Sequence, residues 1–238
     1  MSVVLYGKHP GFGDFLSLGI GRAPLRRLEA WLQDVLPTTR DMLGADWDRA
    51  WETAPDLRFW IGPDVLGIPF VGIWQASVDR VGRQYPLMLG LTGPVLPPPV
   101  HAAHDDGPYI EIASHLADIQ THVTGQGGAQ SLVSGFDFSP LSGTPYDSTQ
   151  GGMLWGMRGD GDLARLFRDA VEADAYCAQY GRSHWWHAGT QTRELGWLSV
   201  NGLPDAQAMR WLLTERVRDT HKIDATASQK DGRGSGQG

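Results

Sequence analysis

The residues best suited to chemistry lie in one short segment, Asp79-Arg80-Val81-Gly82-Arg83, which places three charged side chains around a glycine. Guanidinium groups bind carboxylates and phosphates through paired N–H donors, so Arg80 and Arg83 would suit an acidic group on a partner. The same pattern is typical of a hairpin in which Asp79 accepts hydrogen bonds from turn amides and pairs with a neighbouring arginine. The sequence favours neither interpretation, because turn chemistry and surface recognition can coexist.

A second candidate is the glycine-rich segment 7–21, which follows an apolar run. Such a loop can present backbone amides to a phosphate. It lacks the lysine-serine or lysine-threonine ending of a P-loop, however, and Asp14 places negative charge where a phosphate would sit. We therefore expect a structural turn with glycines at positive φ. If this segment and the 79–83 segment lie at the same end of a sheet, Asp14 would face Arg80 or Arg83 in one site.

The eight histidines invite a metal hypothesis, which their spacing does not support. His101 and His104 lie in a proline-rich connector. His184 and His187 lie on a predicted strand, where a spacing of three directs side chains to opposite faces. Metal ligands must converge. We expect no metal site and no cofactor.

Catalysis finds equally little support. Ser77, Ser183 and Cys177 are the conceivable nucleophiles, and none lies in a Gly-x-Ser-x-Gly elbow. Cys177 is expected to be a small buried side chain. In the pair Trp185-Trp186, strand alternation predicts one buried ring and one ring near the surface. The sequence therefore predicts a protein that is not an enzyme.

The apolar pattern predicts the elements that must position these segments. Val3 to Tyr6 is expected to be a buried strand that enters the glycine-rich segment. Stripes of period 3.6 predict helices, two of them in the first third of the chain, with Trp47 and Trp51 facing the core. The helices are predicted at about 24–36, 43–51, 109–123 and 163–171 and after Pro204, and further strands at 57–61, 70–78, 87–91, 185–188 and 194–200.

Bulk properties restrict the class of protein. The chain has 238 residues and a formal net charge of −7, which argues against sequence-independent binding to nucleic acid or acidic lipid and favours a protein partner. The single cysteine fits a reducing cytoplasm, and no export signal or membrane span is evident. We expect one compact domain over residues 1–220. Residues 221–238, rich in glycine and serine, are expected to be a disordered tail.

Several motifs, taken together, resemble the TagF/ImpM family of type VI secretion-associated proteins. The first is Tyr6-Gly7-Lys8-x-Pro10, followed by Gly13-Asp14-Phe15 and later by Trp31-Leu32-Gln33. The most specific is the run from Ser77 to Arg83, Ser-Val-Asp-Arg-Val-Gly-Arg, which precedes Tyr85-Pro86-Leu87. The resemblance is strong over about the first ninety residues, and reappears in Ser183-x-Trp185-Trp186 and Gly202-Leu203-Pro204.

This resemblance implies an α/β fold, a layered sandwich with a central mixed sheet flanked by helices, in agreement with the predicted element order. It also implies a cytoplasmic, post-translational negative regulator that binds the forkhead-associated scaffold protein of the secretion system. Some relatives are fused to a PppA-type phosphatase domain, so a link to that pathway is expected. The candidate partner-binding residues are Lys8, Asp14, Asp79, Arg80 and Arg83.

Two other functions stay open at this point. The first is a hydrolase acting on a modified secretion-system protein, which would need a convergent nucleophile and base or a metal. A pocket that holds His184 or His187 beside Ser77 or Asp79 would favour this function. The second is a structural subunit of the apparatus, which would co-purify with the assembled machine in fixed proportion.

Overall fold

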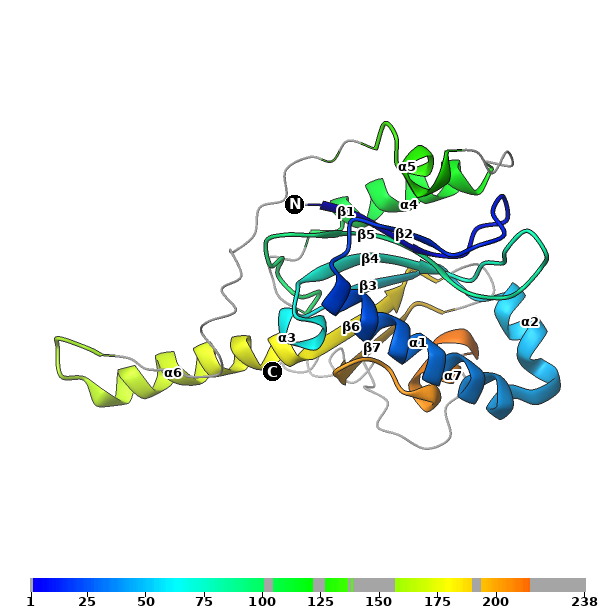
Figure 1. The fold of residues 1–238 in the computed structure, drawn as a ribbon. Helices are drawn as coiled ribbons and strands as arrows, with labels where there is room; N and C mark the ends of the chain where they lie inside the picture. The colour runs from blue at the N-terminus through cyan, green and yellow to red at the C-terminus, as the bar shows by residue number, and fades with distance from the viewer. Residues whose placement is uncertain are drawn as a thin grey trace, which may run out of the picture.

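The computed structural model describes residues 2–100, 105–121, 127–136, 138, 157–189 and 194–214. These residues form one seven-stranded sheet with helices on both faces (Figure 1). The strands are β1 (Ser2–Gly7), β2 (Leu16–Leu18), β3 (Leu57–Ile61), β4 (Phe70–Gln75), β5 (Leu87–Thr92), β6 (Arg182–His187) and β7 (Gly196–Asn201). The helices are α1 (Arg22–Leu43), η1 (Gly44–Asp46), α2 (Trp47–Glu52), α3 (Pro63–Leu66), α4 (Gly107–Gln120), α5 (Gly128–Leu132), α6 (Leu163–Ala178), η2 (Gln179–Gly181) and α7 (Ala206–Thr214).

The sheet has the order β2-β1-β5-β4-β3-β6-β7. The layered α/β arrangement is confirmed, but the sheet is antiparallel rather than mixed, since every pair of neighbouring strands among the described residues runs antiparallel. The connections explain this difference. Strands that are consecutive in the sequence, such as β3, β4 and β5, also lie side by side, and a parallel pair would need a longer crossover.

Strand alternation divides the apolar side chains between two cores. In β1, Val4 and Tyr6 face the core under α1, α2 and α7, whereas Leu5 faces the core under α4 and α5. In β4, Trp74 and Ile73 separate in the same way. Both faces of the central strands are therefore buried, which is why they have continuous apolar sequences rather than alternating ones.

The helix α1 extends further than its sequence predicted. Its stripe of Leu28, Leu32 and Val35 is buried as expected, but the helix continues through Pro37 to Leu43 instead of ending near residue 36. Further apolar contacts at its carboxyl end outweigh the helix-breaking tendency of proline. Trp47 and Trp51 of the next helix are buried in the same core, as predicted.

Other elements match with shifted ends. The strand predicted at 70–78 ends at Gln75, after which only an isolated bridge joins Val78 to Gln84. The elements β2, α3 and α5 were not predicted, because each has five residues or fewer and shows no periodicity. Residues 221–238 and most of the connector at 134–151 lie outside the described residues. Within the described part, no helix combines the length and the apolar character needed to cross a membrane.

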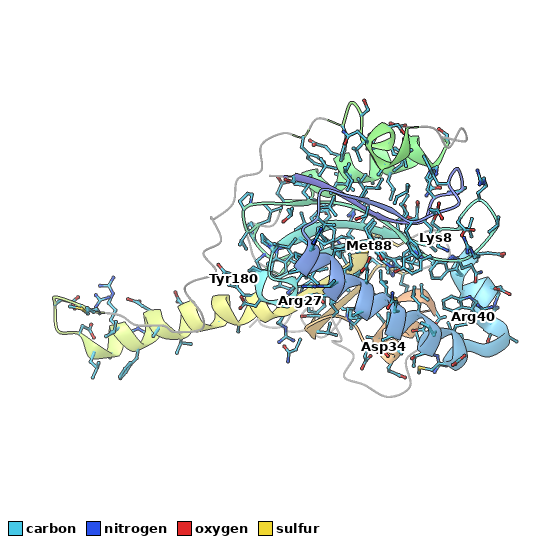
Figure 2. All side chains as sticks on the ribbon, viewed as in Figure 1. Lys8, Arg27, Asp34, Arg40, Met88 and Tyr180 are labelled. Atoms are coloured by element: carbon cyan, nitrogen blue, oxygen red, sulfur yellow. The ribbon has the colours of Figure 1, made fainter. Side chains whose placement is uncertain are left out.

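The helix α6 departs most from a compact domain. It projects from the sheet, as Figure 1 shows, and Figure 2 places Tyr180 near its base and Lys8 at the opposite end of the sheet. The predicted stripe forms a helix, but Leu163, Phe167 and Val171 are exposed to 58%, 59% and 69%. The sequence pattern therefore predicted the helix correctly but did not predict whether its apolar face would be buried.

Candidate partner-binding site

Two loops meet at the end of the sheet opposite α6. The glycine loop (residues 8–15) joins β1 to β2, and the Asp79 hairpin (residues 78–84) lies between β4 and β5. The backbone N–H of Arg80 donates to Phe12 O at 2.9 Å, and Arg83 Nη2 donates to Gly13 O at 3.0 Å. Both segments therefore lie at one end of the sheet, which was the condition for their forming one site.

A buried carboxylate organises the hairpin. Asp79 Oδ2 accepts from Lys8 Nζ at 2.9 Å and from Arg83 Nε at 2.6 Å. Its Oδ1 accepts from the backbone N–H groups of Val81 and Arg83 at 3.0 and 2.9 Å. The side chain of Asp79 has no exposed surface, and that of Lys8 is only 8% exposed. The hairpin interpretation, in which Asp79 binds turn amides and an arginine, is confirmed by these contacts.

The environment of Asp79 keeps it ionised. Burial by itself raises the pKa of this carboxyl group, but donors from the Arg83 backbone, Lys8, the Arg83 side chain and Val81 together hold its pKa well below the ordinary value. The folded protein is therefore stabilised by this group above the pH at which an unfolded aspartate ionises, near 4. That contribution is lost as the pH falls below about 4, because the folded state then has to take up a proton on a carboxylate that donors surround.

The backbone at Gly7 brings Lys8 next to this carboxylate. Gly7 has φ of +131°, and a Cβ there would lie 1.9 Å from Pro86 O, so only glycine allows this close approach to the strand entering β5. Lys8 N then donates to the same Pro86 O at 3.1 Å. The Lys8 ammonium group lies 4.8 Å from the centre of the Phe15 ring. Phe15 itself is 53% exposed and packs edge-on against Tyr85.

The helix α2 supports the hairpin from the other side. Trp47 Nε1 donates to Gln84 Oε1 at 2.5 Å, and Trp51 Nε1 donates to Ser77 O at 3.0 Å. Both indoles are buried, so these hydrogen bonds fix the two ends of the hairpin relative to the core. The hairpin is thus held by α2, by the glycine loop and by the ion pairs of Asp79.

The five predicted site residues separate into two groups. Lys8 and Asp79 are buried, so a role in partner binding would be to position their neighbours. Asp14, Arg80 and Arg83 are exposed. No hydrogen bond or ion pair joins Asp14 to either arginine within the described residues, so the expected facing of Asp14 and an arginine is not observed. Partner binding by all five residues stays a prediction.

Sequence reasoning missed the supporting residues of the site. The Gly13 carbonyl, the exposed Phe15 ring and the tryptophan donors of α2 complete the arrangement. Gly13 and Phe15 flank Asp14 in one of the motifs already singled out, so their position was a usable signal. The tryptophan hydrogen bonds to Ser77 and Gln84 join residues 26 and 37 positions apart, and no local pattern reveals such contacts.

The φ angles of the loop glycines agree in part with the predictions, and the burial of Trp185 and Trp186 agrees with them. Of the five glycines in segment 7–21, Gly7 and Gly19 have positive φ, as expected of structural turns. Trp185 is fully buried and Trp186 half-buried, so strand alternation divides this pair as predicted. The side chain of Cys177 lies outside the described side chains.

The candidate serines and His184 do not form a nucleophile–base pair among the described residues. His184 Nε2 lies 2.9 Å from Gln179 Oε1, and burial, together with the charge of Arg182, lowers the pKa of His184 to about 4. Ser77 Oγ is buried without a hydrogen-bond partner in the described part of the chain, and Ser183 Oγ donates to Gly202 O at 2.6 Å. Neither hydroxyl has a general base as its partner. His101 and His104 lie outside the described residues.

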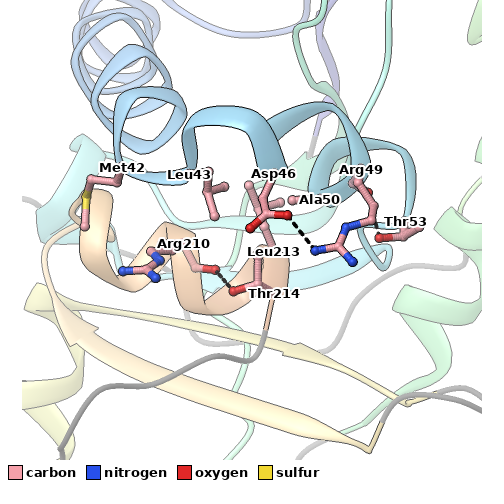
Figure 3. Close-up of a pocket in the computed structure, with 9 residues that line it drawn as sticks. All are labelled: Met42, Leu43, Asp46, Arg49, Ala50, Thr53, Arg210, Leu213 and Thr214. Carbon is pink, nitrogen blue, oxygen red and sulfur yellow. Dashed lines mark hydrogen bonds and ion pairs between the residues drawn. The ribbon is translucent and has the colours of Figure 1, made fainter.

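A shallow pocket lies elsewhere, between the carboxyl end of α1, α2 and α7 (Figure 3). Arg49 Nη2 and Asp46 Oδ1 form an exposed ion pair at 2.7 Å along one wall. The hydroxyls of Thr53 and Thr214 donate to helix carbonyls at 2.8 Å. None of the predicted site residues lines this pocket. No group of three or more potential metal ligands gathers within the described residues.

Comparisons with known proteins agree with this fold. A family model described as the TagF N-terminal domain, type VI secretion system-associated, matches residues 4–130. The crystal structure of PA0076 from Pseudomonas aeruginosa PAO1 is 27% identical, with a TM-score of 0.69, over 93% of this chain and 98% of that chain. A comparison with curated proteins gave no match. Because the family model spans more than half of the chain and both loops of the site, this chain belongs to the TagF family of type VI secretion system-associated proteins.

Proposed function

We propose that this protein is a cytoplasmic accessory factor that restrains the type VI secretion system after translation, by binding its forkhead-associated scaffold protein and without catalytic turnover. The observation that carries the proposal is the family match over residues 4–130, which includes the glycine loop and the Asp79 hairpin. We further propose that it acts in the same pathway as a PppA-type phosphatase, since some relatives are fused to such a domain.

The geometry of the hairpin supports a binding role. The buried ion pairs of Asp79 and the hydrogen bonds from α2 hold the backbone of the turn, so the points from which its exposed side chains project are fixed. Rigid presentation lowers the entropy lost when a partner binds. Neither Ser77 nor Ser183 is paired with a base among the described residues, which favours binding over hydrolysis as the role of this region.

The experiment that tests the proposal has two parts. First, the purified protein and the purified forkhead-associated protein of the same bacterium are mixed, and binding is measured by calorimetry. Second, secretion is measured in cells that lack or overproduce the protein. We expect direct binding, increased secretion on deletion and decreased secretion on overproduction.

Each alternative gives a different result. Absence of binding by the wild-type protein would contradict the adaptor role. Loss of secretion on deletion, with the protein found in fixed proportion in the assembled machine, would instead identify a structural subunit. Turnover of a modified scaffold protein by the purified chain would identify a hydrolase.

A further inference from the structure

The two arginines of the hairpin differ in how their charges are used. The Arg83 guanidinium donates from Nε to the buried Asp79 carboxylate and from Nη2 to Gly13 O, so its charge is paired within the fold although the side chain is 63% exposed. No ion pair or hydrogen bond engages the Arg80 guanidinium within the part of the chain that the structure describes, although its backbone N–H is fixed to Phe12 O. Of the two hairpin arginines, Arg80 is therefore the one whose guanidinium has no acceptor among the described residues.

The Arg80 guanidinium lies directly over the glycine loop. A Cβ built on Gly13 would be 3.2 Å from Arg80 Nη2, and Gly13 O accepts from Arg83. Both guanidinium groups thus gather at one glycine. A Cβ at this distance would displace the flexible Arg80 guanidinium by only a few tenths of an ångström, so Gly13 leaves room for Arg80 across the loop without being required there.

The charges at this end of the hairpin do not balance. Lys8, Arg80 and Arg83 supply three positive charges, whereas Asp79 supplies one negative charge to the shared network. Even with the exposed Asp14 counted, one positive charge remains in excess in this set, on a chain whose formal net charge is −7. A further carboxylate, Asp48, lies at the base of the hairpin, where it accepts from Gln84 Nε2 at 3.1 Å. A local excess of positive charge attracts negatively charged groups at close range, even on a protein whose net charge is negative.

Exposed apolar side chains lie on the same two loops as Arg80 and Gly13. Val81, the next residue, is 70% exposed, and Phe15 at the end of the glycine loop is 53% exposed. A guanidinium group beside exposed aliphatic and aromatic side chains is typical of the anchors of protein interfaces, where arginine and aromatic residues are enriched. The surface therefore suits a segment that carries both acidic and apolar side chains.

We infer that Arg80 binds a carboxylate in an acidic, partly apolar segment of the partner protein, with Val81 and Phe15 as its apolar contacts and Arg83 as a positioning residue. This inference rests on the proposed function for the identity of the partner, but the site itself follows from the structure. One guanidinium can form a bidentate pair with either a carboxylate or a phosphate. A carboxylate carries one negative charge and a phosphate carries nearly two, and because the Arg83 guanidinium is already paired with Asp79, the single charge of Arg80 matches a carboxylate better.

The test begins with the scaffold protein and calorimetry on four chains: wild type, Arg80→Gln, Arg80→Lys and Arg168→Gln. Arg168 is an exposed arginine of α6, far along the chain from the hairpin, and serves as the matched control. We expect Arg80→Gln to weaken binding at least tenfold, as charged hydrogen bonds to a desolvated group do, with an unchanged melting temperature. Arg80→Lys should recover part of the affinity, and Arg168→Gln should bind as the wild type does. Equal affinity of wild type and Arg80→Gln would overturn the inference and leave the proposed function intact.

A second measurement does not depend on the scaffold protein. A synthetic six-residue peptide alternating glutamate and leucine is titrated into the isotope-labelled full chain, beside a glutamine-leucine peptide of the same length. We expect the glutamate peptide alone to shift the NMR signals of the Gly13 and Val81 amides and the Arg80 Nε–H, and these shifts should disappear in Arg80→Gln. If the scaffold is not bound but these shifts occur, the proposed function fails and the site stands.

A third arm distinguishes carboxylate from phosphate. The same peptide with one phosphothreonine in place of a glutamate should bind no more than threefold tighter than the parent. Tighter binding by tenfold or more would overturn the assignment to a carboxylate. Absence of any shift with the glutamate peptide would overturn the site as a whole.

Discussion

The helices α1 and α6 have similarly amphipathic sequences but opposite surroundings. Leu28 and Leu32 of α1 are completely buried against the sheet, whereas Leu163 and Phe167 of α6 are more than half exposed. Periodicity gives each helix an apolar face, but it does not supply the surface that covers that face. The comparison shows that an apolar stripe predicts a helix and leaves its burial undecided.

The same contrast separates two groups of ion pairs. Asp79 is buried between Lys8 and Arg83 at the end of the sheet near α1 and α2. At the start of α6, Arg158 pairs with Asp160 and Asp169, and both carboxylates are about half exposed. Water screens the exposed ion pairs of Arg158 and competes for their hydrogen bonds. Ion pairs of similar length therefore contribute differently to stability in the two groups.

Breaking the buried ion group should have the largest effect. Asp79→Ala leaves the Lys8 ammonium group buried without its carboxylate, and we expect a loss of about 3–5 kcal/mol in the free energy of unfolding, measured by urea denaturation. The control, Asp169→Ala, removes a carboxylate from the exposed group and should leave the urea midpoint unchanged. A larger effect at Asp169 than at Asp79 would reverse the comparison.

A matched pair of leucine substitutions tests the two helices. Leu32→Ala opens a cavity in the core under α1 and should cost about 2–5 kcal/mol of unfolding free energy. Leu163→Ala on α6 should change it by no more than about 0.5 kcal/mol, since the side chain is 58% exposed. Thermal or chemical denaturation of both variants measures the difference. Equal losses would show that the apolar face of α6 is covered in solution.

The stability of the protein should also depend on pH through His184, which is buried on β6. The pKa of His184 is lowered to about 4 by burial and by Arg182, so the folded state holds this imidazole neutral while the unfolded chain protonates it near pH 6.5. Between these values the unfolded state binds more protons, and stability therefore falls as the pH falls from 6.5 to 4. We expect a loss of about 2 kcal/mol in the free energy of unfolding over this range. In His184→Gln this part of the slope should vanish, and an unchanged slope would exclude His184 as its source.

The smallest predicted effect compares two glycines. Gly82 in the hairpin has φ of +84° with open space around its Cα, so Gly82→Ala should cost about 1 kcal/mol through backbone strain alone. Gly181, at the base of α6, has ordinary φ and equally open space, so Gly181→Ala should be neutral or slightly stabilising. Chemical denaturation measures both. A neutral Gly82→Ala would mean that the hairpin tolerates a different turn.

The sequence by itself determined the helices, the strands and the segments of the site. Apolar periodicity depends on neighbours a few residues away, so it located α1, α4, α6 and most strands, and the charges around Gly82 marked the hairpin. The short elements β2, α3 and α5 escaped because too few residues carry a period.

Only the tertiary structure decided which side chains are buried and which charged groups form ion pairs. It set the antiparallel pairing of the sheet, left the stripe of α6 uncovered, and placed Lys8 beside Asp79, a contact across 71 positions of the chain. It also separated two exposed arginines that are alike in sequence: Arg83 pairs with Asp79 and Gly13 O, whereas the Arg80 guanidinium has no acceptor among the described residues. Burial and ion pairing depend on residues distant in the chain, and local sequence therefore cannot specify them.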